Sequence, residues 1–277
     1  MKLTFEYFFP ALRPWVVNLV NVWPAYIIKP QFAAWEVLHI LSLVLLGGAA
    51  ILMNLRLIGA GITDEPPSVV YRNLRRWQDV GVIGIVVSGI LIGMANAERL
   101  YDSTAFVVKM LALVAGVILT YGASRPVARD EGAVGPGARL SLLVGGALFV
   151  LAIGVFVTGA LINVGLFHVL TAAALLVLAV TRGRLRWIYL AGLLALIAVQ
   201  SFITHAMIQP DDLARLDPVN KTFFVLFSVW IFGAAAVQLF ARRADGDTAG
   251  PLAKAIGYAT ILVWITGAAA GRWIAFA

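Results

Sequence analysis

The stretch that decides the fold is residues 34–55, which read AWEVLHILSLVLLGGAAILMNL. It carries a single charged side chain, Glu36, and is long enough to cross about 30 Å of hydrocarbon. Lipid offers the backbone no hydrogen-bond partners, so a spanning segment must be a helix or a strand of a closed barrel. Barrel strands alternate polar and apolar residues, and this run does not. The stretch therefore predicts a transmembrane helix.

The composition of the whole chain agrees with this prediction. Apolar residues make up 61% and charged residues 13% of the 277 positions, whereas about 25% of a soluble domain is charged. The chain has no cysteine, which excludes disulfides, thiolate metal sites and iron–sulfur clusters. Its net charge of +7 lies in short loops between apolar runs, a pattern of membrane topology and not of nucleic-acid binding. We expect an all-α polytopic membrane helical bundle whose main partner is the lipid bilayer.

Eight stretches have the length and composition of transmembrane spans, which makes eight transmembrane helices the predicted number. They are about 34–55, 78–97, 105–123, 139–162, 164–181, 186–207, 220–241 and 254–275.

Residues 1–33 precede the first span and are rich in aromatic residues and proline. Interfacial aromatics of this kind are typical of segments that lie along the membrane surface. We predict an amphipathic interfacial helix here, and a ninth span over 11–29 is the alternative. Because Lys2 and Glu6 precede no apolar core with a small-residue cleavage site, no cleavable signal peptide is expected.

Positive charge is concentrated in alternate loops. The loops after the odd-numbered spans carry Arg56, Arg72, Arg75, Arg76, Arg125, Arg129, Arg139, Arg182, Arg184, Arg186, Arg242, Arg243 and Lys254. The turn between spans four and five carries no positive charge, and the loop between six and seven carries Asp211, Asp212 and Asp217. The positive-inside rule therefore predicts a multi-pass protein of the bacterial inner membrane with both termini in the periplasm.

The two halves of the chain resemble each other. The features that match in order are His39 with His168, Ser88 with Ser201, Met94 with Met207, Lys109 with Lys221, and Thr158 with Thr266. Each half has an even number of spans, so the halves have the same orientation, as in parallel repeats about an axis along the membrane normal. We predict two four-helix repeats, residues 34–162 and 163–277, after the N-terminal segment.

The three histidines are predicted to lie at similar depth near the outer face. His39 and His168 lie about one turn into spans one and five, and His205 lies near the end of span six. Met94 and Met207 lie at the outer ends of spans two and six. Imidazole and thioether ligands suit copper where cysteine is absent. Histidines at matched depth on different helices equally suit axial ligation of a b-type haem.

Three further polar residues belong to this candidate site. Glu36 precedes His39 by three residues and shares its helix face, where it could orient the imidazole of a metal ligand. Lys109 and Lys221 lie about a turn into spans three and seven on the same outer side. Such lysines snorkel to the interface by default. They would repel a bare copper ion, but they would pair with haem propionates.

The segments WEVLHILSLVLLGGAAILMNLRLIG, VSGILIG and AFVVKMLALVAGVILTYGASR resemble CopD-like membrane proteins. The resemblance covers the first four spans best and implies eight spans and a role in copper resistance or uptake. HemJ-type protoporphyrinogen oxidases are similar more distantly, and they imply a histidine in the first helix and bound haem b. Carried over to this chain, the resemblance supports His39 and Lys109 and, through the repeat, His168 and Lys221.

Three functional hypotheses follow. The first is a CopD-like inner-membrane protein that binds copper through His39, His168 and His205, with Met94, Met207 and Glu36 in support, for transport or homeostasis. The second is a b-type haem protein, an oxidoreductase if it is an enzyme, that transfers electrons between quinone and a periplasmic carrier. The third is a structural subunit of a membrane complex with no chemistry of its own. Glycine loops for phosphate and hydrolase motifs are absent from the sequence.

Overall fold

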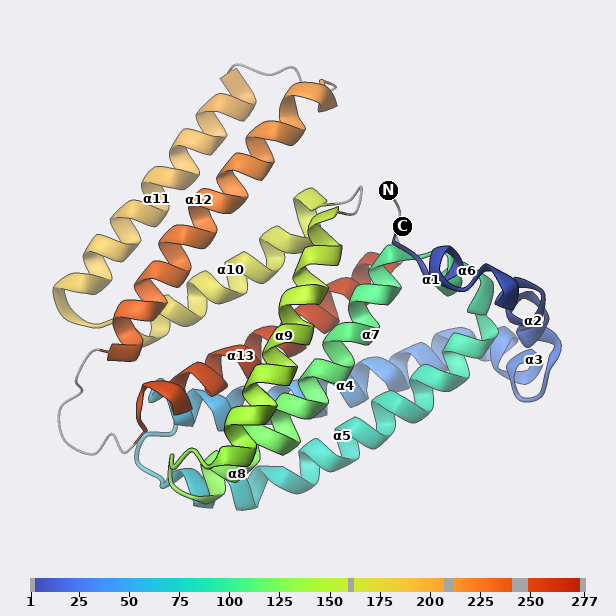
Figure 1. The fold of residues 1–277 in the computed structure, drawn as a ribbon, viewed down its shortest axis with the longest axis horizontal. Helices are drawn as coiled ribbons and strands as arrows, with labels where there is room; N and C mark the ends of the chain where they lie inside the picture. The colour runs from blue at the N-terminus through green and yellow to red at the C-terminus, as the bar shows by residue number, and fades with distance from the viewer. Residues whose placement is uncertain (1–2, 159–161, 207–211, 241–248, 275–277) are drawn as a thin grey trace. The chain divides into compact units, whose positions relative to one another are not determined.

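The structure is a computed structural model that describes residues 3–158, 162–206, 212–240 and 249–274. The described residues form helices and no strands (Figure 1). Seven helical segments within them are long and apolar enough to cross a membrane. These observations confirm the predicted all-α polytopic membrane helical bundle. The segments comprise α4 (Phe32–Ile58), α5 (Pro67–Ala95), α7 (Thr104–Val117) with its continuations η4 (Ile118–Ser124) and α8 (Arg125–Arg129), α9 (Pro136–Thr158), α11 (Gly183–Ala206), α12 (Leu213–Phe240) and α13 (Pro251–Trp273).

The fifth predicted span corresponds to α10 (Ile162–Val180). Its apolar part, Phe167–Val180, is shorter than the other seven segments, so the described residues contain seven full-length spans where eight were predicted. Several helices also extend beyond their apolar part. For example, α5 begins at Pro67, eleven residues before the predicted span, because proline is well suited to the first turn of a helix.

The N-terminal segment differs from the prediction of one amphipathic helix. It consists of short pieces: α1 (Phe5–Phe8), η1 (Pro10–Leu12), α2 (Arg13–Asn18), η2 (Leu19–Asn21), α3 (Ala25–Ile28) and η3 (Lys29–Gln31). Proline lacks an N–H and clashes with the preceding turn, so the prolines at 10, 14, 24 and 30 break any longer helix. The alternative of a ninth span over 11–29 is wrong for the same reason.

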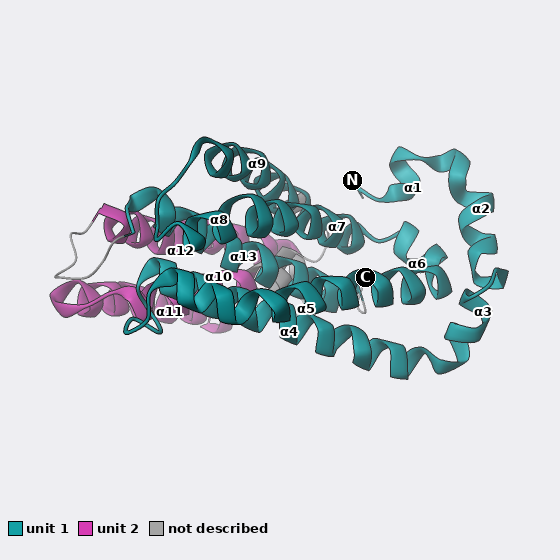
Figure 2. Cartoon of the chain, turned by 90° about the horizontal axis from the view of Figure 1, so that it is seen from below, with its two compact units in different colours: residues 1–162, 248–277 teal, residues 163–247 magenta. Residues whose placement is uncertain are grey.

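The chain divides into two compact units (Figure 2). Unit 1 comprises Met1–Ile162 and Thr248–Ala277, and unit 2 comprises Asn163–Asp247. The first boundary coincides with the predicted repeat boundary. The last helix, however, packs with the first half, because α13 contacts α4 and α7. The internal duplication itself stays a prediction.

In unit 1, α4 and α5 make the most extensive helix contact. Two glycines of α5 allow this close approach. A Cβ atom on Gly81 would lie 2.5 Å from the backbone nitrogen of Leu46, and one on Gly84 would lie 2.3 Å from Oγ of Ser42. Lipid gives no hydrophobic drive for helix association, so close packing over small residues is what stabilises such pairs.

A buried polar network lies at the end of unit 1 where α5 and α13 begin. Arg125 is 8% exposed, and its Nε donates to Gln78 Oε1 at 2.8 Å and its Nη2 to the carbonyl of Arg75 at 3.0 Å. Its Nη1 pairs with Asp79 at 2.8 Å, and the guanidinium carbon lies 4.0 Å from the ring centre of Tyr121. The π-helical turn η4 immediately precedes this arginine. A charge this deep is tolerated because its donors are satisfied.

Unit 2 is held together partly by one tryptophan between α11 and α12. Trp230 Nε1 donates to the carbonyl of Tyr189 at 3.0 Å, and the ring lies so close to Gly192 that a Cβ there would approach it to 2.1 Å. The hydroxyl of Tyr189 in turn donates to the carbonyl of Ala174 on α10 at 3.1 Å. These contacts tie the three helices of the unit together.

Replacing Gly81 by alanine is expected to lower the stability of unit 1 by about 1–3 kcal/mol, because the new methyl group meets backbone atoms that cannot move aside. The measurement is thermal unfolding in detergent, followed by circular dichroism. Gly48→Ala is the matched control, since nothing lies within 4 Å of its Cβ position. Alanine is the better helix former, so the control should be neutral or slightly stabilising. Equal losses in both variants would contradict the close-approach argument.

Arg125→Met is expected to cost about 1–3 kcal/mol, because it leaves the buried Oε1 of Gln78 without its charged donor and removes the ion partner of Asp79. The control is Arg129→Met in the same short helix, whose side chain is 63% exposed and pairs with Asp130 at the surface. That variant should change stability little. A stability loss at Arg129 as large as that at Arg125 would rule out a special role for the buried network.

Candidate functional site

Unit 1 contains a cavity of about 770 Å³ at the end opposite the Arg125 network. Its wall is made by the first turns of α4 and α7, the last turns of α5 and α13, the short helix α6 (Ala97–Tyr101) and the N-terminal segment. Most of the side chains in this wall are apolar or aromatic. The polar exceptions are Glu36, His39, Asn96, Arg99, Tyr101, Lys109 and Arg272. A largely apolar cavity of this size with a few convergent polar groups is typical of a small-molecule site.

His39 lies at the centre of a chain of polar contacts in this wall. It is 8% exposed, its Nδ1 lies 2.8 Å from Ser88 Oγ, and its Nε2 lies 3.1 Å from Lys109 Nζ. The hydroxyl of Ser88 donates to the carbonyl of Gly84 at 2.5 Å. Ammonium groups only donate, so Nε2 accepts from Lys109 and the ring proton is on Nδ1, where it is donated to Ser88. The contacts therefore assign one neutral tautomer of His39.

The sequence explains why these residues meet. Ser88 follows Gly81 and Gly84 by seven and four residues, so all three share the face of α5 that packs on α4. A Cβ on Gly89 would lie 3.2 Å from Cε1 of His39, so the glycine leaves room for the ring. On α7, the hydroxyl of Ser103 accepts from the backbone N–H three residues later and caps the helix, one and a half turns before Lys109.

The structure gives Lys109 a role that the sequence did not suggest. Snorkelling was the default expectation, yet its ammonium donates to a histidine inside the unit. Its side chain also lies against α13, since a Cβ on Gly271 would be 3.6 Å from Nζ. A lysine held between α4 and α13 places a positive charge inside the cavity wall.

Glu36 and Met94, two other predicted site residues, have different relations to the cavity. Glu36 is exposed and belongs to the cavity wall, but the partners of the His39 ring are Ser88 and Lys109. The orienting role predicted for Glu36 therefore falls to Ser88. Met94 is half-buried, and the methionine that lines the cavity is Met110.

The remaining predicted residues belong to unit 2. His168 is exposed on α10. His205 is exposed at the end of α11, and its Nδ1 lies 2.9 Å from the carbonyl of Ser201. Lys221 pairs with Asp217 at 2.5 Å, so its local partner differs from that of Lys109. Met207 lies outside the described residues. The shared site of three histidines stays a prediction.

Across the described residues, no group of three or more His, Cys, Asp or Glu side chains is arranged to hold a metal ion. The cavity wall is largely apolar, and its polar groups include one imidazole, one carboxylate, one amide, one phenol and three cationic side chains, with one thioether beside them. Such a set is suited to an amphipathic organic ligand or a cofactor with its own macrocycle.

Sequence reasoning missed three members of the site. Ser88 was noted only as a matching feature of the two halves, and Met110 was not noted at all although it adjoins Lys109 in the chain. Trp264, whose Nε1 donates to Thr120 Oγ1 at 3.0 Å, also belongs to the cavity wall. The sequence did not identify Trp264 as a member of this site, because the last span was expected to belong to the second repeat.

Fold and site together define a polytopic helical membrane protein with a polar-centred, largely apolar cavity at one end of its larger unit. The chain belongs to the Family of unknown function (DUF6644), whose model matches residues 26–165. The match contains His39, Ser88 and Lys109 but not α13. No curated protein and no solved structure matches the chain.

The contact between His39 and Lys109 can be tested by a double-mutant cycle on stability. His39→Ala and Lys109→Met are expected to be non-additive by about 0.5–3 kcal/mol, as is usual for residues in one hydrogen-bond network. The control cycle pairs Lys109→Met with Ser124→Ala, which bonds to Asn54 near the opposite end of the unit and should be additive. Additivity in both cycles would show that the His39–Lys109 contact contributes nothing.

Proposed function

We propose that the cavity of unit 1 binds a b-type haem and that the protein is an electron-transfer component of the bacterial inner membrane. The observation that carries this proposal is the state of His39. Its Nδ1–H is donated to Ser88, which leaves the lone pair of Nε2 directed at the cavity side, where Lys109 now donates to it. A histidine whose second nitrogen is held in this way could hold the haem iron through Nε2.

The remaining lining residues fit the haem. Apolar and aromatic side chains suit the macrocycle, and 770 Å³ lies within the usual range for cofactor and ligand sites. Lys109, Arg99 and Arg272 supply positive charge in the same wall for the propionates. Lys109 would then exchange its imidazole partner for a carboxylate. Met110 would offer a thioether as a further ligand to the iron.

A bound haem would supply one-electron chemistry. The chain's own residues would set its properties: Ser88 orients the ligand imidazole, the cationic side chains hold the carboxylates, and the apolar wall excludes water. By the positive-inside rule the cavity faces the periplasmic side, so we propose a periplasmic carrier and a quinone as the redox partners.

Copper binding, to which the CopD-like resemblance points, has less support from this geometry. The Nε2 atom that would take a copper ion has an ammonium 3.1 Å away, and a bare cation next to Lys109 would be repelled. Among the residues that line the cavity, Met110 is the single soft ligand for copper. The copper site and the structural-subunit role remain alternatives that the same experiment separates.

The experiment is an absorption spectrum of protein purified from membranes, together with its iron and copper content. We expect a Soret band, its loss in His39→Ala, and a haem affinity about 10- to 100-fold lower in Ser88→Ala, because such supporting hydrogen bonds typically have effects of this size.

His205→Ala is the matched control, since this histidine is exposed in unit 2 and should leave the spectrum unchanged. A preparation without a Soret band would refute the haem proposal. Copper that is bound by the native chain and lost in His39→Ala would establish the copper alternative instead. A stable complex with neither metal would indicate the structural role.

A further inference from the structure

The N-terminal segment closes one side of the cavity. Its first helical pieces α1, η1 and α2, together with the start of η2, contribute Phe5, Phe9, Leu12, Trp15, Val16 and Leu19 to the cavity wall. These residues come from a region of short helical pieces, whereas most of the rest of the wall comes from the long helices α4, α5, α7 and α13, with a smaller part from the short helix α6. The cavity is therefore bounded on one side by long helices and on the other by short helical pieces.

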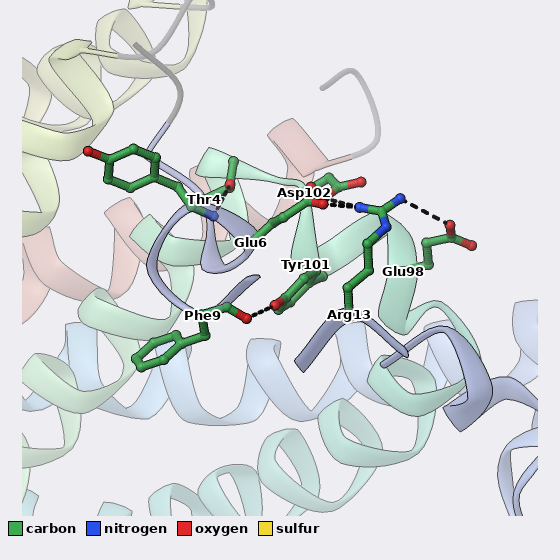
Figure 3. Close-up of polar contacts among 8 residues, drawn as sticks. Thr4, Glu6, Phe9, Arg13, Glu98, Tyr101 and Asp102 are labelled. Carbon is green, nitrogen blue, oxygen red and sulfur yellow. Dashed lines mark hydrogen bonds and ion pairs between the residues drawn. The ribbon is translucent and has the colours of Figure 1, made fainter. Parts of the chain in front are cut away.

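We call the part of the N-terminal segment that lines the cavity the cover. One arginine joins the cover to the neighbouring helices (Figure 3). Arg13 pairs with Glu6 in its own segment, lies 3.6 Å from Glu98 of α6 (Ala97–Tyr101) and lies 3.5 Å from Asp102 just after α6. The hydrogen bond to Glu6 holds the pKa of Arg13 above its ordinary value, so the guanidinium stays charged. Arg13 thus joins one carboxylate of the N-terminal segment to two carboxylates at α6. We call the contact between the N-terminal segment and α6 with the start of α7 the seam.

Two further contacts cross the same seam. The hydroxyl of Tyr101 donates to the carbonyl of Phe9 (Figure 3), and the rings of Phe5 and Phe106 lie with their centres 5.6 Å apart. Each contact joins the segment to α6 or to the first turn of α7.

We expect these contacts to break at a lower free-energy cost than the contacts between the long helices. The side chain of Arg13 is 42% exposed and its partners are 36–60% exposed, and exposed ion pairs contribute little stability. The cover also buries little of its own surface, since Phe9, Leu12 and Trp15 are 52%, 47% and 63% exposed. Segments with few buried contacts open locally at low cost, whereas the close-packed α4–α5 pair does not.

The outward side of the segment is aromatic. Tyr7, Phe8, Trp23 and Tyr26 do not line the cavity, and each is more than half exposed. Tyrosine and tryptophan favour the headgroup level of a bilayer, where one part of the ring is apolar and another is wet. An opening at this place would face the lipid interface.

We propose that residues 5–19 form a lid that admits a lipid-soluble amphipath to the cavity from the adjoining leaflet, with Arg13 as its latch. The inference rests on the proposed function only in taking the cavity as a ligand site. It adds the route by which the ligand arrives and the contact that regulates exchange.

The test uses the absence of native cysteine. A single Leu113→Cys in the cavity wall provides a thiol whose rate of reaction with a membrane-permeant maleimide, in nanodiscs, reports how often the cavity opens. Adding Arg13→Ala is expected to raise this rate by about 3- to 10-fold, as loss of the two weak ion pairs to Glu98 of α6 and to Asp102 just after it would do. The Glu98→Gln, Asp102→Asn double variant should raise it similarly.

The two changes should also be non-additive, because they break the same contacts. Lys29→Ala is the matched control: it removes one positive charge from the same segment, it is exposed, and no carboxylate among the described residues lies within ion-pair distance of it. Tyr101→Phe is a second probe of the seam that keeps every charge, and it should speed the reaction as well.

A reaction rate in Arg13→Ala equal to that in Lys29→Ala would overturn the lid, as would a thiol that stays unreactive in every variant. Circular dichroism of each variant shows that the bundle remains folded. Because the labelling needs no haem, a latch-dependent rate without a Soret band would leave the lid standing and refute the haem. A Soret band with a latch-independent rate would do the reverse.

Discussion

The close approach of α4 and α5 is the constraint on which the site depends. Gly81 and Gly84 bring the two backbones so near that side chains at these positions would clash with α4. One turn further along the same face, Ser88 then reaches His39 within hydrogen-bond distance. The polar contact is a consequence of the packing, because a lipid environment rewards short interhelical distances between small residues. A wider separation would leave the imidazole without the partner that selects its tautomer.

Unit 1 separates its polar groups into two regions with an apolar layer between them. One region is the cavity around His39, and the other is the satisfied network of Arg125. The layer between consists of buried residues of α4, α5, α7, η4 and α13, which are Leu46, Ala50, Ile85, Ala112, Ala115, Leu119, Val263 and Trp264. The two regions have different roles because they differ in how their donors are used. Arg125 is enclosed by its partners, whereas Lys109 and His39 bond to each other and also line the cavity.

The sequence predicted part of this site for sound physical reasons. Ionisable residues are costly in an apolar span, so His39 and Lys109 stand out by composition alone. Composition does not predict their contact with each other, because the two residues lie 70 positions apart in the chain and on different helices. The orienting partner was assigned to Glu36 because sequence spacing identifies neighbours on one helix, while the actual partner, Ser88, comes from another. Met110 was overlooked because one methionine among many apolar residues carries no signal.

The sequence by itself determined that the chain is a helical membrane protein, and approximately where its spans lie, because these depend on local composition and on the length needed to cross a bilayer. It also located the polar residues worth considering. Only the tertiary structure decided which of them meet, that α13 packs with the first half, and that the proline-broken N-terminal segment covers a cavity. Those outcomes depend on contacts between distant segments, and apolar helices look alike in composition whichever neighbours they choose.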